Sequence, residues 1–243
     1  VLLLDHPRED QKENINVLKF SANNLMKLIN DVLDINKIES GKLELEKAPF
    51  KIRDLAYNIY RTFKVRADHK LITLSLNISN DLASVIVLGD QTRLTQILSN
   101  LLDNALKFTK KGAVTFSINT IKKTEDQIAL QFCISDTGIG IPKEKQELVF
   151  ESFTQASTST TRNYGGTGLG LAIVRNLLEL HESTISIQSD INVGTTFTFE
   201  ICFYLFDLGT NTFTETADIN NEYMNISDLK ILIAEDNQIN ILL

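Results

Sequence analysis

The chain has 243 residues, of which 43% are hydrophobic and 23% charged, and its formal net charge is -7. This length allows one or two domains with a sizeable buried core, and the acidic balance argues against DNA or RNA as the main partner, because nucleic-acid binders usually carry a basic surface. No stretch approaches the ~18 apolar residues of a membrane-spanning helix. No segment resembles a signal peptide either, although a membrane anchor elsewhere in a longer parent protein stays open.

The two cysteines, Cys133 and Cys202, each lie in an apolar, alternating run. This pattern predicts two small core residues rather than the two halves of a disulfide. Unpaired thiols are typical of a reducing compartment, so we expect a cytoplasmic fragment.

A long amphipathic helix is predicted from about Arg8 to Glu39. Its apolar residues follow the alternating three- and four-residue spacing of a heptad seam, namely Ile15, Leu18, Ala22, Leu25, Ile29 and Val32. Such a seam is typical of a helix that pairs with other helices, and Gly41 is placed to end it. We therefore expect dimerisation through this helix. An ordinary amphipathic helix packed on its own domain is the alternative.

Helices and alternating strands are predicted between Pro49 and about residue 206. The helices are expected over about 52–68, from a cap at Asp90 to about 108, over 144–150 and over 169–181. The strands are expected over 71–79, 85–87, 114–118, 128–134, 185–187 and 196–203, with a hairpin turn at 122–127. The predicted fold class is α+β, a two-layer α/β sandwich whose mixed, largely antiparallel sheet carries its helices on one face.

The end of the chain has a different composition. Residues 207–228 are polar and poor in aliphatic side chains, which indicates a linker. Leu229–Ala234 is a short apolar run typical of a buried parallel strand, and Glu235 and Asp236 follow it directly. The predicted domain boundaries are 1–46 for a helical segment, 47–206 for the α/β domain, 207–228 for the linker and 229–243 for the start of a further domain.

The first of three clusters whose side chains could bind a ligand lies on the helix expected to start at Asp90. Asn100, Asn104 and Lys107 are spaced four and three residues apart, so they share one helix face. Amide oxygens can coordinate a hard cation such as Mg2+, and a lysine can neutralise phosphate. Plain solvent exposure is the alternative for such a face taken alone.

The other two clusters are rich in glycine. In the first, Asp136 ends a predicted strand and can accept a hydrogen bond from an adenine amino group, while Gly138 and Gly140 remove side chains where the backbone turns under a base. A structural turn is the alternative there. The second, residues 165–171, leads into a helix whose free N–H groups can bind phosphate. It lacks the spacing of a P-loop and the βαβ context of a dinucleotide fingerprint.

Taken in order, these segments resemble the boxes of sensor histidine kinases. Four segments resemble the N, G1, F and G2 boxes of that family, in this order: SNLLDNALKF, DTGIGIP, FESFTQ and GGTGLGLAI. The segment LINDVLDINKIESGKLELE resembles the second dimerisation helix of the family. The segment ILIAEDNQIN resembles the first strand of a receiver domain. The resemblance covers residues ~12–204 and that tail. It indicates a hybrid kinase of the ATPase superfamily shared with gyrase, the large heat-shock chaperone and the mismatch-repair ATPases.

The resemblance implies an ATP-binding catalytic fragment with ATP and Mg2+ as cofactors. It would transfer the γ-phosphoryl group to a histidine on a dimerisation helix, for relay to an aspartate of a receiver domain. Catalytic roles fall on Asn100, Asn104 (as Mg2+ ligand) and Lys107. The implied nucleotide pocket adds Asp136, Gly138, Gly140, Ile141, Phe153, Gly166, Thr167, Gly168, Leu169, Gly170 and Leu171. Phe150 and Phe153 would anchor a lid formed by Gln155–Gly165.

The acceptor pattern of the family, which is similar to SHEIRTP, is missing. None of His6, His69 and His181 matches it, so we expect this fragment to bind ATP without phosphorylating itself. The implied partners are a second copy through the N-terminal helix and a receiver domain, in the same parent chain or separate; nucleic acid is not expected.

Three other functions stay open. One is a water-using ATPase of the same superfamily, which would need a glutamate where Gln96 stands. The others are a non-catalytic nucleotide-binding interaction module and a kinase that acts on a serine of a regulatory protein.

Overall fold

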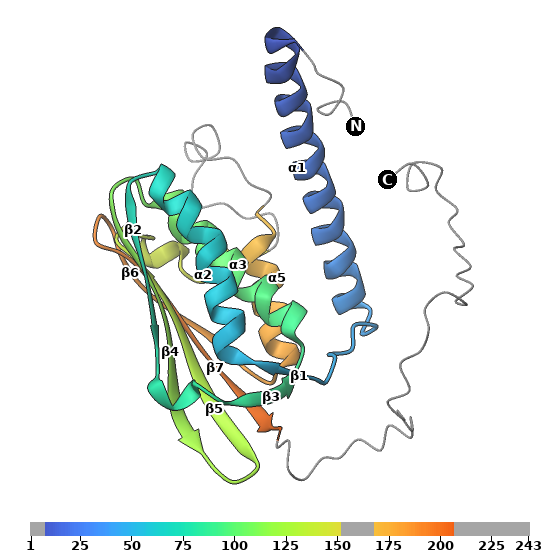
Figure 1. Cartoon of the computed structure of the whole chain (residues 1–243), viewed down its shortest axis with the longest axis vertical. Helices are drawn as coiled ribbons and strands as arrows, with labels where there is room; N and C mark the ends of the chain where they lie inside the picture. The colour runs from blue at the N-terminus through green and yellow to red at the C-terminus, as the bar shows by residue number, and fades with distance from the viewer. Residues whose placement is uncertain (1–7, 152–167, 207–243) are drawn as a thin grey trace, which may run out of the picture. The chain divides into compact units, whose positions relative to one another are not determined.

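The structure is a computed structural model that describes residues 8–151 and 168–206, as a long helix followed by a sheet with helices on it (Figure 1). The helices are α1 (Glu9–Glu39), α2 (Ile52–His69), α3 (Gln91–Phe108) and α5 (Gly170–Leu180). The strands are β1 (Ala48–Lys51), β2 (Ile72–Ile78), β3 (Ile86–Gly89), β4 (Gly112–Lys123), β5 (Gln127–Asp136), β6 (Ile185–Asp190) and β7 (Gly194–Leu205). Among these residues, no helix is long and apolar enough to cross a membrane.

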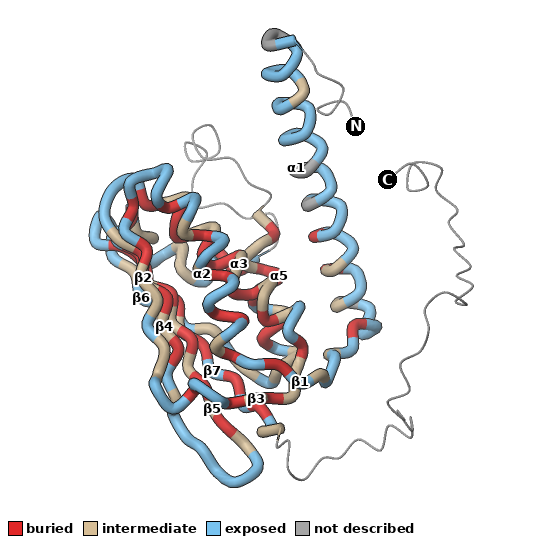
Figure 2. Tube along the Cα trace, viewed as in Figure 1, coloured by how far each residue is buried: buried red, intermediate tan, exposed pale blue. Residues whose placement is uncertain are grey.

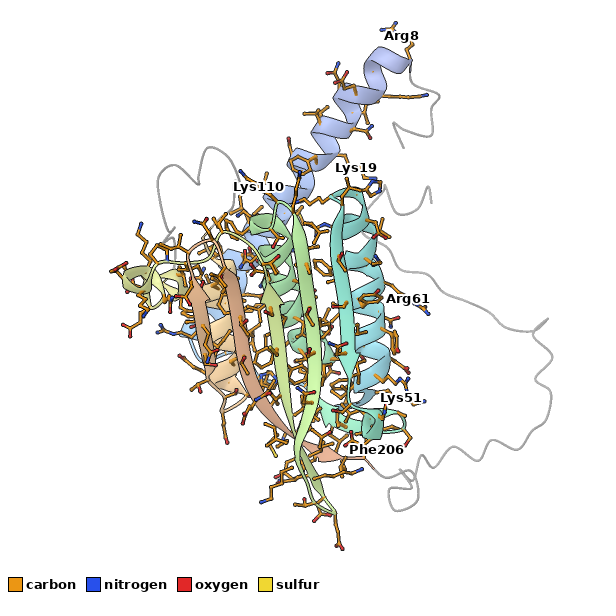
Figure 3. The ribbon with its side chains drawn as sticks, turned by 90° about the vertical axis from the view of Figure 1, so that its left-hand side faces the viewer. Arg8, Lys19, Lys51, Arg61, Lys110 and Phe206 are labelled. Carbon is orange, nitrogen blue, oxygen red and sulfur yellow. The ribbon has the colours of Figure 1, made fainter. Side chains whose placement is uncertain are left out.

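One seven-stranded sheet has the order β1-β3-β7-β5-β4-β2, and β6 pairs with β7 beside β3. Only β2 and β4 run parallel; the other pairs are antiparallel. Helices α2, α3 and α5 lie together on one face of the sheet, and the other face is open (Figures 1 and 3). The predicted fold class, a largely antiparallel sandwich with helices on one face, is confirmed.

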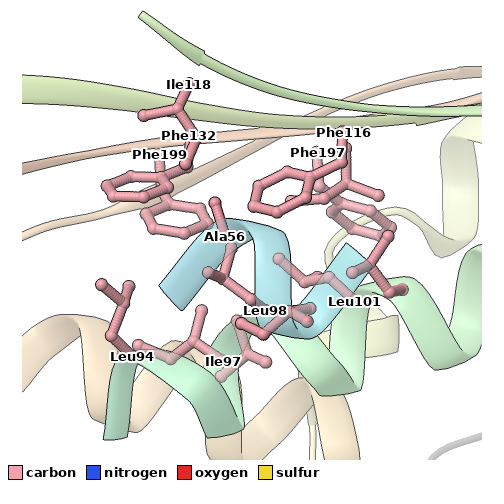
Figure 4. Close-up of a cluster of buried hydrophobic side chains, with 14 of the residues drawn as sticks. Ala56, Leu94, Ile97, Leu98, Leu101, Phe116, Ile118, Phe132, Phe197 and Phe199 are labelled. Carbon is pink, nitrogen blue, oxygen red and sulfur yellow. The ribbon is translucent and has the colours of Figure 1, made fainter. Parts of the chain in front are cut away.

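The core forms between the sheet and the helices, where the buried segments in Figure 2 gather. Phe132 and Phe199 stack with their ring centroids 5.0 Å apart. Leu94, Ile97 and Leu98 of α3 face these rings and are fully buried (Figure 4). Burying a side chain of this size contributes ~1.5–3 kcal/mol. The apolar face of α3 is thereby fixed against the sheet, and this fixes where its polar side chains lie.

The prediction that both cysteines belong to the core was wrong. Cys133 is half-buried and Cys202 is exposed, although both thiols are free as expected. Side chains alternate along a strand, and the neighbours Phe132 and Phe203 point into the core. The two cysteines therefore lie on the open face of the sheet.

Two further details differ from the sequence prediction. The strand β1 was missed; it pairs antiparallel with β3. The helix expected over 144–150 is instead two 3-10 turns, Lys143–Lys145 and Leu148–Phe150. Starting an α-helix in so short a segment is unfavourable, and burial of the Phe150 ring against Phe197 fixes the backbone path instead.

Most of helix α1 is exposed, as Figure 2 shows, and this includes most of its large apolar residues. Along the predicted seam, Leu18 is 65% exposed and Leu25 58%. Only the last turns are anchored: Ile35 is buried, and Asp34 accepts hydrogen bonds from Arg93 at 3.0 Å and Gln96 at 2.8 Å on α3. The rest of α1 presents an apolar stripe that the described part of this chain leaves uncovered.

Candidate functional site

The polar face of α3 forms the first side of the site. Asp90 caps the helix, since its side chain accepts from the backbone N–H of Arg93 at 2.9 Å. Asn100 is buried, whereas Asn104 and Lys107 are half-buried. The Lys107 ammonium lies 4.9 Å from the ring centroid of Phe108 at the end of the helix. This face therefore presents amide oxygens and a cation together, as the four- and three-residue spacing predicts.

Helix α2 holds the same half of α3 from the side. Arg66 forms an ion pair with Asp103, which lies between the two asparagines in the sequence. The Lys70 ammonium donates to the carbonyl oxygen of Leu106 at 2.9 Å. Lysine near a helix C-terminus also interacts favourably with the exposed carbonyls and the helix dipole. Both contacts fix the last turns of α3.

Asp136 ends β5 and is the buried acid of the site, with only 9% of its surface exposed. Burial raises the pKa of this carboxyl, because a charge is poorly solvated there. Hydrogen bonds from the backbone N–H groups of Gly138, at 2.7 Å, and Thr195 oppose that rise in pKa. The carboxylate is thus held by two donors and is poised to accept a further hydrogen bond.

The loop after Asp136 runs close to two other segments. The N–H of Ile139 donates to the carbonyl of Phe108 at 3.4 Å, which brings the loop onto the end of α3. Gly140 has a φ of 69°, and a Cβ there would overlap the carbonyl oxygen of Asp190. Only glycine meets both demands without strain. The loop that follows Asp136 and carries Gly138 and Gly140 is called the base loop below. The side of α3 that carries Asn100, Asn104 and Lys107 is called the Asn face. The base loop and the Asn face therefore lie side by side.

A network of hydroxyls behind Asp136 was not predicted from the sequence. Ser189 accepts from the N–H of Ile141 at 2.7 Å, and its hydroxyl lies 2.9 Å from that of Thr195. The side-chain amide of Gln146 donates to the carbonyls of Ile141 and Ser189. These residues lie in ordinary polar positions of alternating strands and turns, so only the pairing of β6 with β7 reveals that they meet.

The start of α5 closes the site. Leu169 is fully buried and precedes the helix, and within the described residues no side chain caps this end. The first backbone N–H groups of a helix have no partner inside the helix, and they bind anions well. A Cβ placed on Gly170 would lie 3.5 Å from the side-chain oxygen of Asn100. The glycine segment and the Asn face are therefore adjacent.

Of the predicted pocket residues, the structure describes Asn100, Asn104, Lys107, Asp136, Gly138, Gly140, Ile141, Gly168, Leu169, Gly170 and Leu171. Phe153, Gly166, Thr167 and the predicted lid lie outside the described residues. So do His6, the predicted linker and the receiver-like strand with Glu235 and Asp236.

The oxygen atoms of the site suit a metal ion that binds together with a polyphosphate. Among the described residues, no group of three or more His, Cys, Asp or Glu side chains gathers to hold a metal ion. Mg2+ keeps several waters and takes oxygen ligands, often from substrate phosphates. The amide oxygens of Asn100 and Asn104 fit an ion of that kind that arrives with a polyphosphate, rather than a resident ion.

Comparison with known families identifies the domain. Residues 89–204 match the family described as "Histidine kinase-, DNA gyrase B-, and HSP90-like ATPase". The chain carries a domain of this ATPase family. The matched residues include the Asn face, the base loop and the start of α5.

Two kinases are among the proteins similar to this chain. The signal transduction histidine-protein kinase BarA of Shigella flexneri is 39% identical over 209 residues, which are 86% of this chain and 22% of BarA. The autoinducer 2 sensor kinase/phosphatase LuxQ of Vibrio cholerae is 34% identical over 241 residues, 96% of this chain and 27% of LuxQ. The chain thus spans between a fifth and a third of the length of these relatives.

Solved structures agree with this ATPase fold. A crystal structure of full-length ShkA in complex with AMPPNP matches with a TM-score of 0.69 at 30% identity, over 82% of this chain and 40% of ShkA. The histidine kinase AdeS of Acinetobacter baumannii matches with a TM-score of 0.59 at 24% identity, over 82% of this chain and 88% of AdeS, and supports the fold alone.

Proposed function

We propose that this chain is the ATP-binding catalytic fragment of a hybrid sensor histidine kinase. The observation that carries the proposal is the meeting of three groups: the Asn face of α3, the loop around the buried Asp136, and the start of α5. The Asp136 carboxylate would accept a hydrogen bond from the adenine amino group, and the backbone N–H groups of Gly170 and Leu171 would face the phosphates. That ShkA was solved with AMPPNP supports the assignment of an adenine nucleotide.

The remaining side chains of the site would bind the metal ion and the phosphates. Asn104 would hold Mg2+, with Asn100 beside the metal and the phosphates, and Lys107 would contact phosphate directly. When bound, the metal supplies neutralisation of the polyphosphate charge. Phosphoryl transfer depends on positioning and charge stabilisation rather than on covalent chemistry by the protein, and these residues offer both.

In the parent protein the acceptor would be a histidine on a dimerisation helix, with relay to a receiver aspartate. The exposed apolar stripe of α1 supports pairing with a second copy of the chain, because a solvated stripe of this length favours helix–helix association. Light scattering coupled to size-exclusion chromatography tests this: the dimer mass is expected for the wild type, and Leu18→Glu with Leu25→Glu should give the monomer mass.

A water-using ATPase is less well supported. It would need a general base upstream of Asn100, and Gln96 is an amide that cannot accept the proton. The amide of Gln96 also donates to Asp34 at 2.8 Å, and its oxygen accepts from Arg93 at 2.8 Å. This side chain is committed to the contact between α1 and α3.

The deciding experiment is a calorimetric titration of the chain with ADP–Mg2+, repeated with Asp136→Asn. We expect the wild type to bind and the variant to lose ~1.5–3 kcal/mol of binding free energy, the value of a hydrogen bond to a charged group. A folded wild-type chain that binds no adenine nucleotide would refute the proposal and favour the interaction-module alternative.

A further inference from the structure

One glutamine joins the base loop to the strand beside it. Gln146 lies between the two 3-10 turns that follow the loop, and it is half-buried. Its amide nitrogen donates to the carbonyl of Ile141 at 3.0 Å and to the carbonyl of Ser189 at 2.8 Å. Carbonyl oxygens only accept, so the nitrogen must face them and both of its hydrogens are used.

The hydrogen bonds continue from these two residues to Asp136. Ser189 accepts from the N–H of Ile141 and lies 2.9 Å from the hydroxyl of Thr195. Thr195 is paired with Asp136 across β5 and β7, and its backbone N–H donates to the Asp136 carboxylate. Gln146 therefore stands at the outer end of a connected path that ends on the buried acid.

We propose that Gln146 is a positioning residue for recognition of the base. It acts through Ile141 and Ser189: by holding the loop against β6, it keeps the Asp136 carboxylate in one direction. Hydrogen bonds weaken steeply as they lose alignment, so the direction of this carboxylate decides how well an adenine amino group is distinguished. The inference rests on the proposed adenine site.

The test replaces Gln146 by an isosteric acid in the full chain. Gln146→Glu puts an oxygen atom where the amide nitrogen stood, so the side chain repels the two carbonyls. The matched control is Gln188→Glu, which adds the same charge on β6 next to Ser189, where the side chain is exposed and points to the opposite side of the strand.

The dissociation constants for ADP–Mg2+ and inosine diphosphate–Mg2+ are measured for each protein, together with the melting temperature. Inosine carries a carbonyl oxygen in place of the adenine amino group. The ratio of the two constants therefore reports the alignment of Asp136. A general loss of stability lowers the melting temperature but does not change this ratio.

We expect the wild type and Gln188→Glu to prefer ADP by about tenfold or more, the value of a charge-assisted hydrogen bond. In Gln146→Glu the preference should fall to about threefold or less. A folded Gln146→Glu that keeps the wild-type ratio overturns the inference, whatever its melting temperature. A wild type that binds no ADP refutes the proposed function instead. If Gln146→Glu does not fold, Gln146→Leu removes the donors without adding charge and is judged by the same ratio.

Discussion

Gly140 offers a test of the close approach between the base loop and β6, because the chain contains a matched glycine. Gly140 has a φ of 69° and Gly41 a φ of 64°. A Cβ on Gly41 would meet nothing within 4 Å, whereas one on Gly140 would overlap the Asp190 carbonyl oxygen. Alanine at both positions therefore introduces the same backbone strain, and only Gly140→Ala adds a collision.

The magnitudes follow from these two terms. A left-handed conformation costs a residue with a Cβ ~1–2 kcal/mol, which is the whole expected effect of Gly41→Ala at the end of α1. The collision adds ~1–3 kcal/mol, since the Asp190 carbonyl accepts from Val193 at 3.1 Å in a turn and cannot move freely. Gly140→Ala is thus expected to lose ~2–5 kcal/mol of unfolding free energy.

The assay is urea unfolding followed by circular dichroism, with ADP–Mg2+ titration of each folded variant. Gly140→Ala should bind ADP about tenfold or more weakly, because the displaced loop follows Asp136 directly and carries Ile141. Gly41→Ala should bind like the wild type. Equal losses of stability in the two variants, with wild-type ADP binding in both, would refute the close approach of the loop to β6.

Three further predictions concern charges. The raised pKa of Asp136 means that the folded state holds its proton more tightly, so the stability without ligand should fall as pH rises from 3.8 through that raised pKa, and Asp136→Asn should flatten this slope in urea unfolding; a slope that stays unchanged would contradict the burial argument. Asn104→Ala should remove the Mg2+ dependence of ADP binding in calorimetry, and a variant with the wild-type Mg2+ response would place the metal elsewhere. Asp34 and Arg93 form a 3.0 Å ion pair with side-chain exposures of 16% and 21%, so a double-mutant cycle with alanine should give a coupling of ~1–2 kcal/mol, whereas a coupling near zero would make the pair a surface contact.

The helices and strands of the sheet domain could largely be predicted from periodicity and caps. Asp90 caps α3 as its position predicts, and β4 and β5 pair across the predicted turn. Periodicity could not show β1, because four residues are too few to display alternation and the strand exists through pairing with β3. The cysteines were placed wrongly because each adjoins a large apolar side chain of its strand, Phe132 and Phe203, and therefore points to the opposite side.

Some residues of the candidate site could also be predicted from the sequence, and others could not. Asn100, Asn104 and Asp136 could be proposed from the sequence because they belong to short motifs with local meaning. Ser189, Thr195 and Gln146 could not, because their roles depend on contacts with segments far away in the sequence. A hydroxyl or an amide side chain in a strand or a turn carries no local signal, and only the register between β6, β7 and β5 brings these groups together.

The position of β7 has a consequence for how the protein is made. It is the last strand of the domain in the sequence, yet it lies inside the sheet, between β3 and β5. A nascent chain that ends before Gly194 already contains Asp136, but it lacks Thr195 and the strand that buries the carboxylate. Pairing over such long separations is slow, and edges exposed meanwhile are prone to aggregation. The base pocket should therefore form last during synthesis, so that acquiring affinity for nucleotide marks the moment when the sheet is complete.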